Sequence, residues 1–83
     1  MSERRVDRKP PHPRTHRVVK AAHDALVAQQ RSINGLALTS GVARETIHRW
    51  FNGEMDPHVG NLEAVLNTLG LRIVVEPIAG DRP

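Results

Sequence analysis

Cysteine is absent from this sequence of 83 residues, and tyrosine is absent as well. Without cysteine, neither a disulfide nor a thiolate metal site can form, which fits a reducing compartment. No apolar run approaches the roughly 20 residues that span a bilayer. The opening stretch MSERRVDRKPPHPRTHR also lacks the apolar core of a secretory signal. We therefore expect a cytoplasmic protein that does not insert into a membrane.

The patterns that carry catalysis and cofactor binding are missing too. We find no nucleophile paired with a base and no glycine-rich loop that could cradle a phosphate. His12 and His16 are four residues apart, but His12 lies among prolines and no cysteine or carboxylate completes a ligand set. The sequence therefore predicts no enzyme activity, no metal site and no cofactor.

Positive charge is concentrated at the N-terminal end. Residues 1–20 carry seven basic and two acidic side chains, a balance of +5, whereas residues 21–83 carry five basic and seven acidic ones, a balance of −2. A basic segment on a small domain favours an anionic partner, with nucleic acid first and an anionic membrane second. A solubilising, disordered tail is the other interpretation. With three prolines and no periodicity, residues 1–14 are predicted to be a flexible arm, and contact between this arm and DNA stays open.

Apolar periodicity predicts two helices after the arm. Thr15 is expected to cap a first helix that runs to about Gln30. Ser32 is expected to cap a second, short helix, which lacks a capping box because Gly35 stands where Glu or Gln would. Gly41 then breaks the chain and is free to take a positive φ.

Two further helices follow this break. One is predicted over about Arg44 to Phe51 and ends at Asn52-Gly53. The next is expected to begin at Pro57 and to run to about Leu69. Three residues form an i, i+3, i+4 apolar stripe on the first of the two: Ile47, Trp50 and Phe51.

The segment LRIVVE, Leu71 to Glu76, is rich in β-branched residues and predicts a short strand. A lone strand cannot satisfy its own backbone groups, so its expected partner is a second copy of the chain. The predicted fold is all-α, with four to five helices and a C-terminal strand that pairs across a dimer. The domain is expected to span residues 15–76 and to be followed by a flexible tail at 77–83.

The second and third helices together predict a helix-turn-helix unit. Such a unit joins two short helices through a turn of three or four residues that contains glycine. Over about residues 15–71 the chain resembles the lambda-repressor-like, Xre-type helix-turn-helix domain. The matching residues are Leu36-Ala37, Ser40-Gly41-Val42, Thr46-Ile47, Arg49-Trp50, Asn52-Gly53, Pro57, Leu62, Leu66 and Leu69-Gly70.

The chain departs from the family pattern at two positions near DNA. Ala43 stands where members usually have a Ser or Thr that caps the third helix, a difference of about 1 kcal/mol in helix stability. Ile33 stands where members often carry a Gln that touches DNA, so we expect no contact from this residue.

The resemblance implies binding of duplex DNA by a dimer, usually at a near-palindromic operator. The third helix would lie in the major groove, with its outward residues on base edges. Four residues are expected to contact bases: Arg44, Glu45, His48 and Arg49. Arginine can bind guanine through O6 and N7, and glutamate can accept from N4 of cytosine, so we expect a half-site that contains G·C pairs. A solvated polar face, with Glu45 paired to Arg49, is the alternative.

Six other residues are expected to bind phosphates: Ser32, Asn34, Thr46, Asn52, Arg14 and Arg17. Four are expected to form the dimer contact: Leu71, Ile73, Val74 and Val75. The leading functional hypothesis is a sequence-specific transcriptional repressor that acts as a homodimer. The alternative is an antitoxin-type module that neutralises a partner toxin and regulates its own operon.

Overall fold

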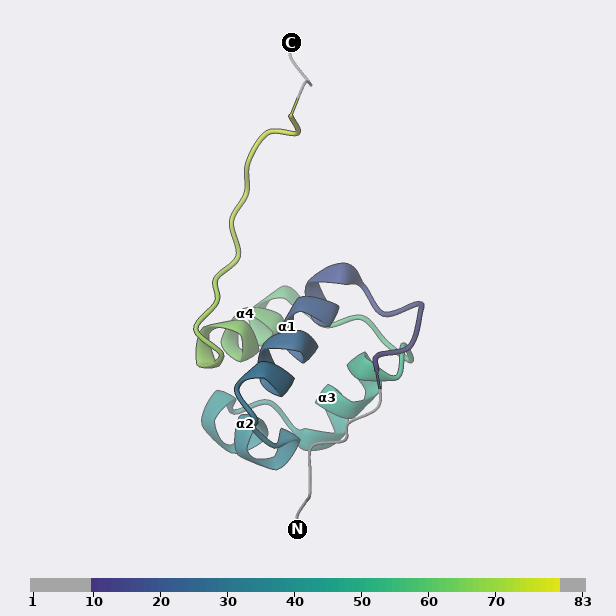
Figure 1. The fold of residues 1–83 in the computed structure, drawn as a ribbon, viewed down its shortest axis with the longest axis vertical. Coiled ribbons are helices and arrows are strands. Elements are labelled where there is room, and N and C mark those ends of the chain that lie inside the picture. The colour runs from purple at the N-terminus through teal and green to yellow at the C-terminus, as the bar shows by residue number, and fades with distance from the viewer. Residues whose placement is uncertain (1–9, 80–83) are drawn as a thin grey trace.

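The computed structural model describes residues 10–79, which form four helices and connecting loops. In chain order the helices are α1 (Arg17–Ala28), α2 (Ile33–Ser40), α3 (Arg44–Phe51) and α4 (Val59–Thr68), as Figure 1 shows. The prediction of an all-α, helix-turn-helix fold is confirmed, with four helices in the described part of the chain.

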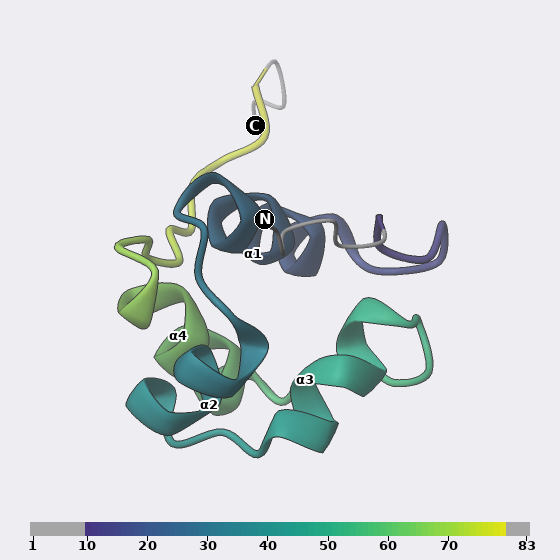
Figure 2. The ribbon, with the colours of Figure 1, turned by 60° about the horizontal axis from the view of Figure 1, so that its bottom comes forward.

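The four helices enclose one apolar core. In Figure 2, α1 lies above the other three helices, and α2 packs against both α3 and α4. Each helix turns an apolar stripe inward, which is how short helices gain stability that propensity alone does not give them. The buried apolar residues are Val19, Ala22, Leu26, Ile33, Leu36, Val42, Ile47, Trp50, Phe51, Val65, Leu66 and Leu69.

The start of α1 differs from the sequence-based prediction. His16, and not Thr15, caps the helix: its Nδ1 atom accepts a hydrogen bond from the Val18 amide at 3.1 Å. Thr15 is engaged elsewhere, because its hydroxyl lies near the backbone carbonyls at the end of α3. That contact joins residues 35 or more positions apart, and no local pattern could reveal it.

The helix-turn-helix unit follows its predicted outline. The Ser32 hydroxyl accepts from the Gly35 amide at 2.9 Å and caps α2. Gly41 has a φ of +81°, so it takes the left-handed conformation that ends α2 and starts the turn. Ala43 occupies the N-cap of α3 and makes no side-chain cap bond, as its methyl group dictates.

The last helix begins later than predicted, at Val59 and not at Pro57, with His58 in the N-cap position. Its C-terminal end is closed by the connection between α1 and α2. Gln29 Nε2 donates to the Leu69 carbonyl and Arg31 Nη1 donates to the Thr68 carbonyl, both at 2.8 Å. These bonds satisfy carbonyls that a helix end leaves without partners.

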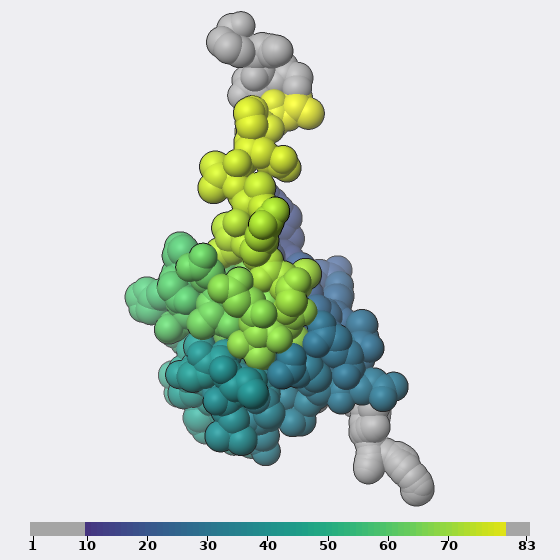
Figure 3. Space-filling view, turned by 90° about the vertical axis from the view of Figure 1, so that its left-hand side faces the viewer, coloured from purple at the N-terminus to yellow at the C-terminus, as the bar shows by residue number. Residues whose placement is uncertain are grey.

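Beyond Gly70 the chain leaves the helical body as an extended tail, residues 71–79, which stands away from the helices in Figures 1 and 3. Residues 10–79 contain no strand, and the strand predicted over Leu71–Glu76 has no segment beside it in the described part of the single chain. A strand needs a neighbour for its backbone groups, so the isolated tail cannot form one alone.

Candidate nucleic-acid interface

The third helix divides into a buried face and an outward face. Ile47, Trp50 and Phe51 are buried and hold α3 against the core. With about 100° of rotation per residue, the four predicted base-contacting residues fall on the opposite face, within an arc of about 140°. The helix is therefore fixed from behind and presents its polar side chains outward.

Three of those four side chains are exposed: Arg44, Glu45 and Arg49. His48 is half-buried, although it lies within the same arc. None of the four takes part in a side-chain hydrogen bond or ion pair within residues 10–79, so the alternative pairing of Glu45 with Arg49 is not formed. The structure thus brings the four together on one face, with two guanidinium groups and one carboxylate open to a ligand.

The predicted phosphate-binding residues come from several elements of the described chain. Asn34 lies exposed in the first turn of α2, Thr46 is half-buried in the first turn of α3, and Asn52 is exposed directly after α3. The Ser32 hydroxyl accepts from a backbone amide, which leaves its own proton available for donation. Arg14 and Arg17 are exposed at the start of α1, which lies nearer the C-terminal end of α3 than its N-terminal end.

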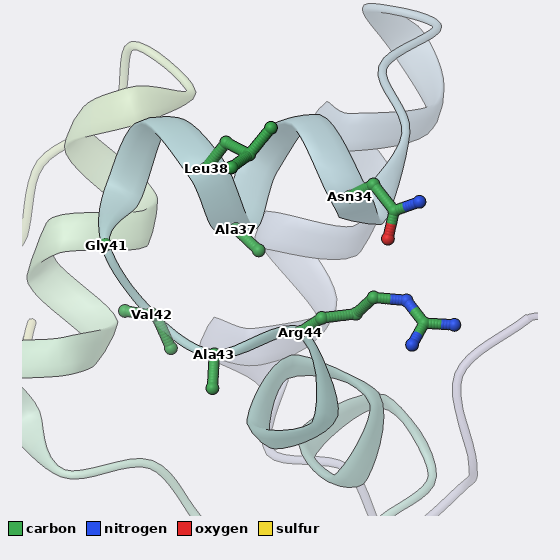
Figure 4. Close-up of a pocket in the computed structure, with 7 residues that line it drawn as sticks. All are labelled: Asn34, Ala37, Leu38, Gly41, Val42, Ala43 and Arg44. Carbon is green, nitrogen blue, oxygen red and sulfur yellow. The ribbon is translucent and has the colours of Figure 1, made fainter.

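A groove of about 620 Å³ runs between α2 and the start of α3. Figure 4 shows Asn34 and Arg44, one from each helix, with their polar ends extended to the same side of this groove. Its floor is apolar and includes Leu38, which is 85% exposed. The sequence alone does not show that Leu38 is exposed while its apolar neighbours Leu36 and Ala37 face the core. A helical wheel that starts at the Ser32 cap would have shown this difference.

Two polar groups lie in the core behind α3. Trp50 is 1% exposed, and its indole N–H has no acceptor among the described residues. His23 is 5% exposed and lies edge-on to the Phe51 ring, with ring centroids 5.0 Å apart. Helical periodicity could have marked His23, because it lies four residues after Val19 and three before Leu26, on the buried stripe of α1.

The end of the predicted arm and Thr15, which follows it, lie against the end of α3. The His12 amide donates to the Phe51 carbonyl at 3.0 Å, and the Thr15 hydroxyl lies 3.2 and 3.3 Å from the Trp50 and Phe51 carbonyls. In Figures 1 and 2 this segment passes beside the loop that follows α3. The sequence pattern does not predict this contact, and the rest of the arm, residues 1–9, lies outside the described residues.

Other kinds of site find little support in residues 10–79. That part of the chain holds no group of three or more histidine or acidic side chains placed to bind a metal. His12 and His16 each use Nδ1 to accept a backbone amide, from Arg14 and Val18 respectively. None of the helices in the described range is long and apolar enough to cross a bilayer.

Comparison with protein families identifies a match to a helix-turn-helix family over residues 24–75, which is more than half of the chain. This range runs from the middle of α1 through the start of the tail and contains the entire helix-turn-helix unit. Comparison with curated proteins and with solved structures finds no match. The chain therefore belongs to the lambda-repressor-like, Xre-type helix-turn-helix family of DNA-binding transcription regulators.

Proposed function

We propose that the protein is a sequence-specific regulator that represses transcription by binding an operator in duplex DNA. The observation that carries this proposal is the outward face of α3, where Arg44, Glu45 and Arg49 are exposed and have no side-chain partner within residues 10–79. In a helix-turn-helix unit this face enters the major groove and its first residues meet base edges. A cytoplasmic setting at the nucleoid follows from this activity.

The chemistry of this face favours G·C pairs. Each arginine can donate two hydrogen bonds to O6 and N7 of a guanine, and such a bidentate contact discriminates by about 1–3 kcal/mol. Glu45 can accept from N4 of cytosine, which would offset the repulsion between its carboxylate and the phosphates. His48, which is half-buried, completes the proposed set.

Phosphate contacts are proposed from Ser32, Asn34, Thr46, Asn52, Arg14 and Arg17. Residues 21–83 carry a balance of −2, so most of the helical body does not attract DNA by its overall charge. The basic residues at the N-terminal end supply that attraction, and binding should therefore weaken with salt.

Dimerisation through the tail would place two copies of α3 on one operator. The proposed dimer residues are exposed in the single chain to these extents: Leu71 38%, Ile73 39%, Val74 61% and Val75 94%. Pairing of two tails would supply the backbone partner that each strand lacks and would bury apolar side chains. Two-fold symmetry then predicts a near-palindromic operator with half-sites about 34 Å apart.

A second candidate function rests on the same exposed tail. In an antitoxin, the apolar residues of the tail would bind a partner toxin, and DNA binding would regulate the operon. Val75 and Ile78, at 94% and 75% exposure, are available to such a partner. Co-purification of a second protein with the chain through its tail would favour this function over a homodimer.

Selection of bound sites from random duplex DNA tests the proposal. We expect a two-fold symmetric site with G·C pairs in each half. Arg49→Ala should relax preference at one base pair by about 1–3 kcal/mol. Lys20→Ala, which removes an exposed cation from α1, should leave the selected sequence unchanged. An unaltered base preference in both Arg44→Ala and Arg49→Ala would show that α3 does not make the proposed contacts.

A further inference from the structure

The tail leaves α4 through a closed turn. Gly70 has a φ of +83°, and its amide donates to the Asn67 carbonyl at 3.0 Å. The Leu71 amide donates to the Leu66 carbonyl at 2.8 Å. This pair of bonds is the Schellman motif, which satisfies carbonyls at the end of a helix. The tail therefore starts from a defined point of the body, and the amide of its first residue is already engaged.

Beyond Leu71 the backbone of the tail is open on both edges. From Arg72 to Glu76 no amide donates to another described residue, and every side chain of this segment is exposed. Open edges of this kind are the surface to which a second extended segment adds as a strand. The tail is thus free to pair along its whole length.

The two faces of the tail differ in character, because side chains alternate along an extended chain. The odd-numbered residues form an apolar face: Leu71, Ile73 and Val75. The even-numbered residues form a face with one cation and one anion: Arg72, Val74 and Glu76. At about 3.3 Å per residue, the two charged residues lie about 13 Å apart along the tail. Neither takes part in an ion pair or a side-chain hydrogen bond within residues 10–79.

Two-fold symmetry restricts how two copies of this tail can pair. In an antiparallel pair of identical strands, the axis passes beside one residue, which then faces its own copy. An axis at Val74 places Arg72 opposite the partner's Glu76, and this pair occurs twice. An axis one residue earlier or later places each charge opposite an uncharged residue, and a parallel pair in register places each charge opposite its own copy. Opposite charges directly across a strand pair stabilise it and like charges destabilise it, so the charges favour the axis at Val74.

The backbone at the two ends of the tail agrees with this register. Opposed residues in an antiparallel pair alternate between hydrogen-bonded and non-hydrogen-bonded pairs. If the pair at Val74 is hydrogen-bonded, Leu71 and the partner's Pro77 oppose each other in a non-hydrogen-bonded pair. Proline has no amide to donate, and the Leu71 amide is already bound to the Leu66 carbonyl. The two residues that cannot donate across the strands therefore face each other where no donor is needed.

We propose that two tails pair in antiparallel orientation about Val74, with Arg72 of each chain opposite the partner's Glu76. This inference rests on the proposed function, which assigns the tail to a homodimer. It adds the register and the two ion pairs that select a second copy of this chain in one orientation. Leu71 and Ile73 are less exposed than Val74, so the apolar face turns toward the helical body at the root of the tail. The ion pairs then lie on the outer face, open to solvent and to salt.

Charge reversal in the full-length chain tests this register. The variants are Arg72→Glu, Glu76→Arg and the double reversal that carries both substitutions. Two controls make the same changes in net charge elsewhere: Lys20→Glu on α1 and Glu63→Arg on α4, both at exposed positions. Sedimentation equilibrium measures the dissociation constant of each dimer. The measurement is made at low salt and again at about 1 M salt, where the Debye length falls to about 3 Å.

Each single reversal should weaken the dimer about 10- to 100-fold at low salt, because two attractive cross-strand pairs become two repulsive ones. The double reversal should return the dissociation constant to within about threefold of the wild-type value. An equal mixture of the two single variants should form a heterodimer of comparable strength, since one chain then carries two anions and the other two cations. All these differences should shrink at high salt, and each control should change the constant by less than about threefold.

Unchanged dimerisation in both single reversals would overturn the inference. In a shifted pair the charges have no opposed partner to lose, and in a parallel pair like charges face each other before and after the reversal. A double reversal and a mixture that both fail to restore the dimer would overturn it as well. A wild-type chain that stays monomeric, alone and on the selected duplex, would instead overturn the proposed homodimer and the inference with it. The two failures are therefore distinguishable.

Discussion

Trp50 packs in the core and holds α3 in place, so that the outward face of this helix is presented to solvent. It is the largest fully buried side chain of the described core, and it lies one position after the exposed Arg49. Its indole N–H is buried without an acceptor in the described part of the chain, and an unsatisfied donor of this kind costs about 1–3 kcal/mol. The residue therefore stabilises the fold by its volume and weakens it slightly by its polar atom.

Substitution of Trp50 separates these two contributions. Trp50→Ala should destabilise the domain by about 3–5 kcal/mol, because it opens a large cavity behind α3. Trp50→Phe should cost much less, about 1–2 kcal/mol, because it leaves a smaller cavity and removes the unsatisfied N–H. Urea unfolding followed by circular dichroism measures both values. Similar destabilisation by the two substitutions would show that the N–H is satisfied in solution.

Among the elements, those defined by local chemistry could be predicted from the sequence. Ser32 and Gly41 mark the limits of α2 through a cap and a left-handed glycine, and the predicted bounds of α3, Arg44 to Phe51, match the structure. The start of α1 could not be predicted, because Thr15 bonds to a carbonyl 35 residues away. Contacts of this length depend on the assembled fold and leave no local pattern.

The candidate site shows the same division. The outward arc of α3 follows from helical periodicity, so its four polar residues could be predicted as one face. The half-buried position of His48 and the exposure of Leu38 depend on how α2 and α3 cross, which the sequence does not specify. The contact of His12 and Thr15 with the end of α3 lay beyond prediction, since its donors come from a proline-rich segment with no periodicity.

Two glycines offer a matched test of the contact between His12 and the chain that follows α3. Gly53 and Gly70 follow α3 and α4 with φ values of +73° and +83°, so alanine at either position costs about 1–2 kcal/mol of backbone strain. Only at Gly53 would the new Cβ meet His12, whereas no described atom lies within 4 Å of a Cβ at Gly70. Gly53→Ala should therefore lower the free energy of unfolding by about 1 kcal/mol more than Gly70→Ala.

Chemical denaturation of both alanine variants measures that difference. The His12→Ala background supplies the control, because there the extra destabilisation at Gly53 should disappear. Equal destabilisation by the two substitutions in the wild-type background would contradict a close seat for His12 on Gly53.

At the scale of the whole molecule, the parts proposed to act on DNA extend from a small helical body in different directions. The tail departs beyond α4, at the other side of the body from the loop that follows α3, as Figures 1 and 2 show. His12 lies at that loop, where its amide donates to the Phe51 carbonyl. The tail and the segment at His12 therefore occupy separate surfaces of the described chain, so a substitution in one should leave the other intact.

Charged substitutions in the tail test the dimer without disturbing the monomer. Alternate residues of a strand point to opposite faces, so Ile73 and Val75 share one face and Val74 lies on the other. All three are exposed in the single chain, and replacement by Lys should change the free energy of unfolding of the monomer by less than about 0.5 kcal/mol.

If paired tails bury the face of Ile73 and Val75, the double substitution Ile73→Lys with Val75→Lys should convert a dimer to a monomer in sedimentation equilibrium. Such a variant should bind a single half-site as the wild-type monomer does, but it should have no preference for two half-sites about 34 Å apart. Val74→Lys serves as the matched control and should preserve the dimer if only the face of Ile73 and Val75 is buried. The opposite pattern would assign the interface to the face of Val74, and a dimer that survives all three substitutions would place it outside the tail.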